Sequence, residues 1–248
     1  MKKTLVLMST TVVAVAVWIT TCCSGAEPAP DAKPSAGEAA IKQAADAGKH
    51  LYLFFYSEDN DATREARKSF EAVMAKMTDV AQWMALKNGA PAEKALVDRF
   101  QLQGLSIPLI IVLAPNGAVT TAGLAEKMPE VKLRDGIAGP CQQKCLKALQ
   151  EKKTVVLCAY PKDLAADDPS LKAVNDLKAD ALNAGRVEVV RIDPADPAEA
   201  AFLRQLDVDP KRGLATVMIA PGRVLLGKFI GPVTKQSLAA ALKSTGSG

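Results

Sequence analysis

Cys141, Cys145 and Cys158 are the residues of this chain best suited to chemistry, because thiols can exchange disulfides, bind metals or cross-link. Cys141 and Cys145 stand four residues apart at the start of an expected helix, so they lie on one face about one turn apart. A disulfide could join them at the frayed helix end, or join Cys145 to Cys158 across the packing of helix on strand. Cys158 alone, inside an apolar run, is expected to be a small buried hydrophobic residue.

A second group of reactive side chains consists of the carboxylates Glu58, Asp59 and Asp61. They follow the apolar run Leu51–Tyr56, which predicts a strand buried on both faces, and precede a helical pattern that starts at Ala62. Their spacing lacks the glycine and the distant glutamate of a calcium loop. We therefore expect them to cap the helix and predict no metal site there.

The remaining features exclude several classes of function. His50 is the single histidine, with no acid or nucleophile beside it, and is expected to lie at the surface or to be a hydrogen-bonded core residue. The sequence has no glycine-rich phosphate loop, so we expect no cofactor. The net charge is only +4, with no basic stripe, which argues against nucleic acid. The chain is 49% apolar and 23% charged, which is typical of folded proteins.

Residues 1–26 resemble a bacterial export signal. Two lysines precede the apolar stretch Thr4–Ile19, and small residues follow it. Ser24–Ala26 suits cleavage by a signal peptidase, whereas the residues before Cys22 suit a lipoprotein, in which that cysteine would be lipidated. Both routes stay open. Residues 27–38 are rich in proline and alanine, which predicts a flexible linker.

The hydrophobic pattern then predicts two similar halves. Residues 39–123 show the order α-β-α-β-α-β-β, residues 124–140 a partly helical connector, and residues 141–248 the order α-β-α-β-α-β-β-α. Tyr56 falls opposite Tyr160, which indicates an internal duplication and two α/β domains. The expected strands are 50–56, 80–86, 109–113, 118–122, 154–160, 187–192, 214–220 and 224–229, and the expected helices are 37–48, 62–77, 92–102, 141–151, 171–182, 194–206 (capped by Asp193) and 232–242.

The segment Phe100–Gly123, FQLQGLSIPLIIVLAPNGAVTTAG, resembles the thioredoxin-fold superfamily. In that superfamily a helix, a proline loop, an apolar strand, an Asn-Gly turn and a second strand follow one another. Pro108 stands where the superfamily carries a cis-proline, beside a groove that binds extended peptide. At the position that corresponds to Pro108, the second half has Ala215 or a neighbouring residue instead of a proline. The resemblance implies two tandem thioredoxin-like domains, each a mixed sheet flanked by helices.

The chain departs from redox-active thioredoxins at the turn after the first strand. Those proteins carry Cys-x-x-Cys there, and the helix dipole favours the thiolate of the first cysteine. Here Asp59 and Ala62 occupy these positions, and Lys162–Ala165 in the second half also lacks cysteine. We therefore expect no redox chemistry at either place.

These patterns favour an exported protein-binding or scaffolding module in the cell envelope, in the periplasm or at the cell surface. Its expected partners are other envelope proteins or extended peptides, and it would contact the membrane only through a lipid on Cys22. Two alternatives use Cys141 and Cys145: a thiol–disulfide oxidoreductase, or a protein that binds copper or zinc.

Overall fold

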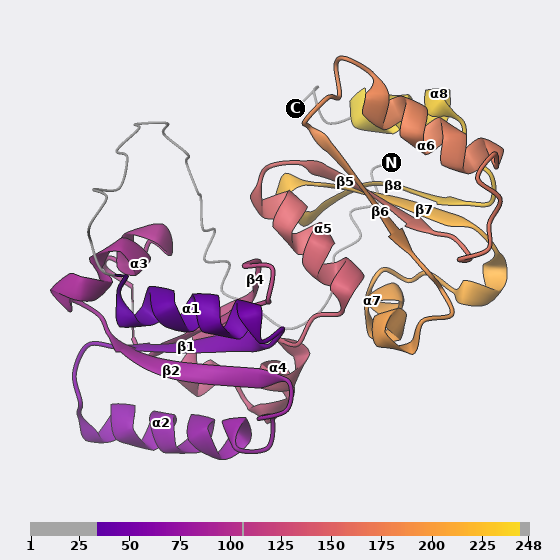
Figure 1. Ribbon diagram of the computed structural model, residues 1–248. Helices are drawn as coiled ribbons and strands as arrows, with labels where there is room; N and C mark the ends of the chain where they lie inside the picture. The colour runs from indigo at the N-terminus through magenta and orange to yellow at the C-terminus, as the bar shows by residue number, and fades with distance from the viewer. Residues whose placement is uncertain (1–33, 106, 244–248) are drawn as a thin grey trace. The chain divides into compact units, whose positions relative to one another are not determined.

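The structure is a computed structural model that describes residues 34–105 and 107–243 (Figure 1). The chain divides into two compact units, one ending at Ala138 and the other beginning at Gly139. The expected signal segment 1–26, with Cys22, lies outside the described residues, as does most of the expected linker. Within the described part of the chain, no helix has the length and apolar character needed to cross a membrane.

Domain 1 is built on a four-stranded mixed sheet in the order β2-β1-β3-β4. The central strand β1 pairs in parallel with β2 and antiparallel with β3, and β3 pairs antiparallel with β4. Residues 50–55 of β1 are all buried, as the unbroken apolar run predicts. The strands are β1 (His50–Tyr56), β2 (Ala81–Lys87), β3 (Leu109–Leu113) and β4 (Val119–Leu124).

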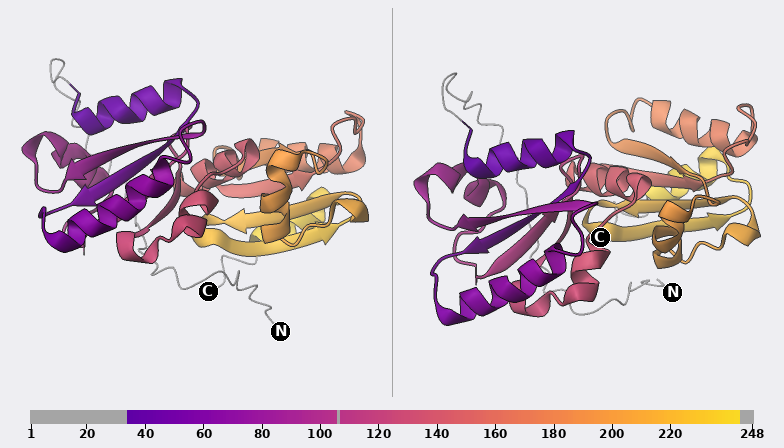
Figure 2. Two further views of the ribbon diagram at one scale, coloured as in Figure 1. Left: turned by 90° about the horizontal axis from the view of Figure 1, so that it is seen from below. Right: turned by 60° about the horizontal axis from the view of Figure 1, so that its bottom comes forward.

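Helices cover both faces of this sheet, with α1 and α2 on opposite sides (Figures 1 and 2). Because side chains alternate along a strand, β1 supplies both cores. Leu51, Leu53 and Phe55 pack on the side of α1 and α3, whereas Tyr52 and Phe54 pack on the side of α2 and α4. The helices are α1 (Ala36–Asp46), α2 (Asp61–Met74), α3 (Lys94–Arg99) and α4 (Glu130–Asp135), with 3₁₀ turns η1 (Pro91–Glu93) and η2 (Ala125–Lys127).

Domain 2 repeats the plan, with strand order β6-β5-β7-β8 and the same parallel and antiparallel pairings. Both domains therefore have the thioredoxin-like fold. In domain 1 the peptide bond between Ile107 and Pro108 is cis. Helices α5 and α7 pack on one face, and α6 and α8 on the other. The elements are β5 (Thr154–Ala159), β6 (Val187–Ile192), β7 (Ala215–Ala220), β8 (Val224–Ile230), α5 (Pro140–Gln150), α6 (Pro169–Ala179), α7 (Ala200–Gln205), α8 (Lys235–Lys243), η3 (Pro197–Glu199), η4 (Pro210–Arg212) and η5 (Pro221–Arg223).

Most of the expected connector, residues 124–140, belongs to domain 1. Strand β4 extends to Leu124, and Met128 and Leu133 are buried in the core beneath α2. The hydroxyl of Tyr52, on the central strand, donates to the carbonyl of Leu133 at 2.6 Å. The irregular pattern of glycine, proline and mixed charge concealed these few buried positions.

Two helix starts also differ from expectation. Helix α1 begins at Ala36, inside the expected linker 27–38, because Ser35 and Glu38 form a capping box. The helix expected over 194–206 begins only at Pro197, where Asp196 accepts from the backbone N–H of Ala198. Asp193 instead closes a short turn with Ala195. Where several neighbouring residues could each be the helix N-cap, the sequence does not show which of them is.

Candidate functional site

The junction between β1 and α2 is where redox-active members of this fold carry their thiols. Here the side chain of Asn60 caps the helix, accepting from the backbone N–H of Thr63 at 2.9 Å. Asp59 and Asp61 pair with Arg64 on the exposed surface instead. The expectation that the acids cap α2 is therefore wrong, because the neutral amide does so. Exposed ion pairs of this kind contribute little to stability.

The capping geometry also moves, by one residue, the positions at which a dithiol would stand if its first cysteine were the helix N-cap. With Asn60 as the N-cap, the pair of positions three residues apart is Asn60 and Thr63, not Asp59 and Ala62. Thr63 is buried, with 5% of its surface exposed, whereas Ala62 is exposed. The run from Ser57 to Asp61 contains several residue types that cap helices, so sequence could not fix this register.

The corresponding junction of domain 2 also lacks a thiol. Asp168 caps α6 by accepting from the backbone N–H groups of Ser170 and Leu171, at 2.8 and 3.3 Å. The expected position, Lys162–Ala165, lies in the turns that precede this cap. Both helix starts are thus capped by side chains that are not thiols.

The proline loop precedes β3 in domain 1. The carbonyl of Pro108 accepts from the backbone N–H of Ala125 at 2.9 Å, so this acceptor is used within the domain. In domain 2 the carbonyl of Leu214 accepts from Gly231 at 2.8 Å in the same way. The carbonyl of Pro108 is thus already hydrogen-bonded within the domain, and proline has no backbone N–H to donate to a peptide.

Cys141 lies in the first turn of α5, after the N-cap Gly139 and Pro140. Its backbone N–H donates to Oε1 of Glu199 at 2.6 Å, and its thiol donates to the carbonyl of Arg191 at 3.4 Å. Partial burial, together with the negative charge of Glu199, raises the pKa of the Cys141 thiol to about 11. The thiolate, which is the nucleophile, is therefore scarce at neutral pH.

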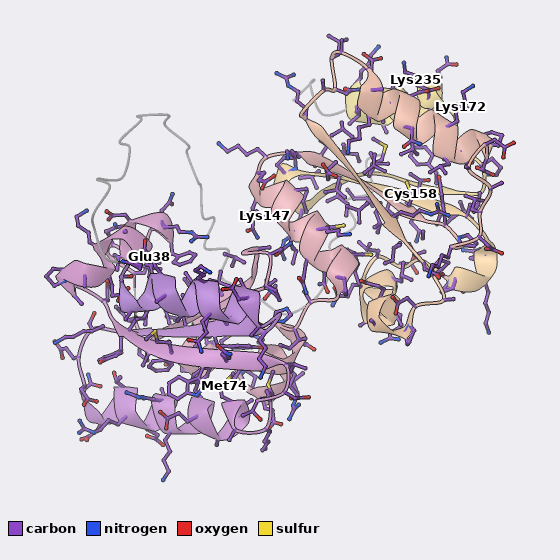
Figure 3. The ribbon with its side chains drawn as sticks, viewed as in Figure 1. Glu38, Met74, Lys147, Cys158, Lys172 and Lys235 are labelled. Carbon is purple, nitrogen blue, oxygen red and sulfur yellow. The ribbon has the colours of Figure 1, made fainter. Side chains whose placement is uncertain are left out.

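Cys145 and Cys158 are both buried, and burial raises the pKa of each thiol, that of Cys158 to about 12. They lie in different cores. Cys145 packs with Val155 and Leu157 beneath α5. Cys158, which is labelled in Figure 3, belongs to the core on the opposite face of the sheet, with Val156. The disulfide expected between Cys145 and Cys158 is therefore wrong, because the sheet separates them. All three cysteines are free thiols in the structure.

Two buried glutamates were missed by the sequence reasoning. Glu93 and Glu199 each end a Pro-Ala-Glu sequence and each accept from the backbone at the start of their domain's first helix. Glu93 also accepts from the hydroxyl of Ser35 at 2.9 Å. Gly139 takes the place of that serine in domain 2, and Oε2 of Glu199 is the one buried side-chain polar atom without a partner among the described residues. The repeated tripeptide was the available signal.

His50 is a hydrogen-bonded core residue, as one of the two expectations for it stated. Its Nε2 accepts from the backbone N–H of Ala138 at 3.1 Å. The ring is 5% exposed, and burial lowers its pKa to about 4. His50 therefore holds the last residue of domain 1, and it is neutral at physiological pH.

Metal binding through clustered side chains receives no support. Over residues 34–105 and 107–243, no three or more His, Cys, Asp and Glu side chains are grouped so as to hold an ion. Glu58, Asp59 and Asp61 are exposed at the β1–α2 turn. The two aspartates form ion pairs with Arg64.

No family model matches the chain. Among curated proteins it is similar to the catalase-peroxidase of Janthinobacterium sp. (strain Marseille), 37% identical over 81 residues, and to that of Desulfitobacterium hafniense (strain Y51), 42% identical over 93 residues. These matches cover 32% and 36% of this chain but 11% and 13% of the two relatives. The chain therefore spans little more than a tenth of the relatives' length.

Solved structures similar to the chain are thioredoxin-fold proteins. A disulphide isomerase from Xylella fastidiosa Temecula1 is 18% identical, with a TM-score of 0.32, and covers 44% of this chain and 92% of its own. The first two thioredoxin domains of Saccharomyces cerevisiae Eps1p are 9% identical, with a TM-score of 0.32, and cover 87% and 98%. Human ERp44 form II is 9% identical, with a TM-score of 0.35, and covers 88% and 58%. Because these scores are low, the fold assignment rests on the strand order and pairing within this chain.

Proposed function

We propose that this chain is an exported thioredoxin-like protein that has no redox activity at the usual site and serves as a protein-binding or scaffolding module in the cell envelope. The observation that carries the proposal is the start of α2. Asn60 caps the helix there, and Thr63 fills the buried position three residues later. Neither side chain can form a disulfide or attack one.

The distribution of cysteines supports the same reading. No cysteine occurs in residues 34–138 of domain 1. In domain 2 the partly exposed thiol, Cys141, has a pKa raised to about 11, mainly by burial. A thiol with so high a pKa attacks disulfides slowly at neutral pH.

The binding and export parts rest on different features. The proline loop before β3 would bind extended peptide segments of other envelope proteins through backbone that precedes Pro108. Export rests on the two lysines and the apolar stretch Thr4–Ile19, followed either by cleavage or by a lipid on Cys22. Localisation by cell fractionation, with and without a Cys22→Ala substitution, tests this part.

A thiol–disulfide oxidoreductase that uses Cys141 and Cys145 is the second candidate. It is favoured by one observation: Cys141 is partly exposed in the first turn of α5, with Cys145 one helical turn further on. The raised pKa values of both thiols oppose it.

Insulin reduction by the chain without residues 1–26 separates the two candidates. We expect no turnover above the uncatalysed rate for the wild type, for Cys141→Ser, or for the matched variant Cys158→Ser. Turnover by the wild type that disappears in Cys141→Ser and persists in Cys158→Ser would overturn the binding role in favour of the oxidoreductase. A zinc or copper content near one per chain, lost in Cys141→Ser, would instead support metal binding through these thiols.

A further inference from the structure

A groove runs along α2 in domain 1, between this helix, η2 and α4. Its volume is 410 Å³, which falls in the range of sites that hold small ligands or side chains. Buried apolar side chains from α2, β3 and the segment after β4 line it: Phe70, Val73, Ile110, Met128 and Leu133. Ile107 and Pro108 do not line the groove, but Ala125 does, and its backbone N–H donates to the carbonyl of Pro108, so one end of the groove adjoins the proline loop.

The charged residues that line this groove are all glutamates: Glu65, Glu126 and Glu130. Glu130 pairs with Lys76 at 3.1 Å and with Arg134 at 2.9 Å. Glu65 and Glu126 are exposed and make no ion pair with any other described residue. Two carboxylates that make no ion pair with a described residue therefore stand beside an apolar floor.

We propose that this groove binds a segment of a partner protein that places an apolar side chain on the floor and a lysine or arginine beside Glu65 and Glu126. The two sides of an interface carry complementary charge, and an apolar pocket filled by one side chain is the usual anchor of a peptide. The acidic rim repels anionic lipid headgroups, so a protein segment fits better than a membrane surface. The inference names the chemistry of the partner in the proposed binding role and rests on that role.

Trp83 provides a direct signal for the groove. Its ring packs edge-on against Phe70, with 5.5 Å between the centroids, and Phe70 lines the groove. The other tryptophan, Trp18, lies in the expected signal segment. In the chain without residues 1–26, the tryptophan fluorescence therefore comes from Trp83 alone, and a bound side chain would change it.

The test is a fluorescence titration with the synthetic peptide acetyl-Gly-Lys-Leu-Leu-Lys-Gly-amide. We expect saturable binding that weakens with added salt, because exposed charges are screened. Glu65→Gln combined with Glu126→Gln should weaken it on the order of tenfold, from the loss of two exposed ion pairs. Asp46→Asn combined with Asp98→Asn removes two charges from α1 and α3, on the opposite face of the sheet, and should leave binding unchanged.

The apolar part of the site is tested by filling it. Ala66 is half-buried and lines the groove from α2, so Ala66→Phe should abolish binding, and Ser69→Phe does the same from an exposed position if Ala66→Phe fails to fold. Circular dichroism checks the fold of each variant. Peptides with glutamate in place of lysine, or serine in place of leucine, should not bind.

Several results would overturn the inference: no saturable binding by the wild type, equal binding of the glutamate peptide, or equal weakening by the opposite-face variant. Dimerisation of the wild type that Ala66→Phe abolishes would show that a second copy of the chain occupies the groove instead. None of these results depends on insulin reduction. If the peptide does not bind and insulin is not reduced, only the proposed binding at the groove is rejected. If insulin is reduced in a reaction that requires Cys141, the proposed binding role of the whole protein is rejected.

Discussion

Oε1 of Glu199 accepts the backbone N–H of Cys141 at 2.6 Å, while its Oε2 has no partner among the described residues. In domain 1 the same arrangement is complete, because the hydroxyl of Ser35 donates to Glu93. Gly139 stands at the corresponding position in domain 2 and has no side chain to supply that donor. The thiol of Cys141 consequently lies beside a buried carboxylate that is only half satisfied.

The first prediction is that Glu199→Gln increases the reactivity of Cys141. Burial is the largest cause of the raised pKa and stays in place, but the repulsion from the carboxylate is removed, so the pKa should fall from about 11. Alkylation of Cys141 by iodoacetamide, followed by mass spectrometry between pH 7 and 10, measures the shift. Glu93→Gln is the matched control in domain 1 and should leave the rate unchanged. An unchanged profile in Glu199→Gln would show that burial alone raises the pKa.

The second prediction concerns acid stability and His50. The folded pKa of about 4 lies below the unfolded value of about 6.5, so the unfolded state binds the proton first. The stability contributed by neutral His50 is present above pH 6.5 and is lost as the pH falls toward 4. The loss is up to about 3 kcal/mol.

Urea denaturation at several pH values between 4.5 and 7.5 measures this loss. His50→Gln keeps an acceptor for the N–H of Ala138 and does not titrate, so it should lose less stability than the wild type over this interval. If the free energy of unfolding fell equally with pH in the wild type and in His50→Gln, His50 would not be the group that titrates. The carboxylates contribute equally to both proteins, so they cannot cause a difference between them.

The third prediction places the end of domain 1 at Ala138. Residues 34–138 should fold alone, whereas residues 34–123 lack the buried side chains of Met128 and Leu133. Loss of two such side chains costs about 3 to 6 kcal/mol, which is most of the stability of a small domain. Circular dichroism and the fluorescence of Trp83 report folding. If residues 34–123 unfolded cooperatively and were as stable as residues 34–138, residues 124–138 would be a connector and not part of domain 1.

The fourth prediction restores a dithiol to α2. Asn60→Cys combined with Thr63→Cys should form a disulfide that dithiothreitol reduces, and the resulting dithiol should reduce insulin and return to the disulfide, because the first thiol would stand at the helix N-terminus. Asp59→Cys combined with Ala62→Cys is the matched control, shifted by one residue, and should be much less active. Equal activity of the two double variants would show that the capping register does not control reactivity.

Sequence alone could predict the strands and their duplication. The strands over Leu109–Leu113 and Val187–Ile192 have the bounds that the apolar runs indicate, since runs between turn residues define buried strands clearly. The cis peptide bond at Pro108 was also expected, from the resemblance to the thioredoxin superfamily. These features depend on local pattern.

The features that sequence could not predict depend on contacts between distant residues. The burial of Glu93 and Glu199 follows from helix starts 58 residues away along the chain. The separation of Cys145 from Cys158 follows from the face of the sheet on which each side chain lies. The register of Asn60 depends on which of several capping residues the backbone selects. Apart from the repeated Pro-Ala-Glu tripeptide, none of these features leaves a pattern in the sequence.

The hydrogen bonds at the end of domain 1 also determine how that domain responds to mechanical force. Ala138 is held by the side chain of His50, and the carbonyl of Gly136 by the hydroxyl of Thr120 at 2.7 Å. Tension transmitted from Gly139 reaches these side-chain bonds before it loads any pair of strands. We expect residues 136–138 to detach first under such tension, releasing at most about 10 Å of chain before the sheet is loaded.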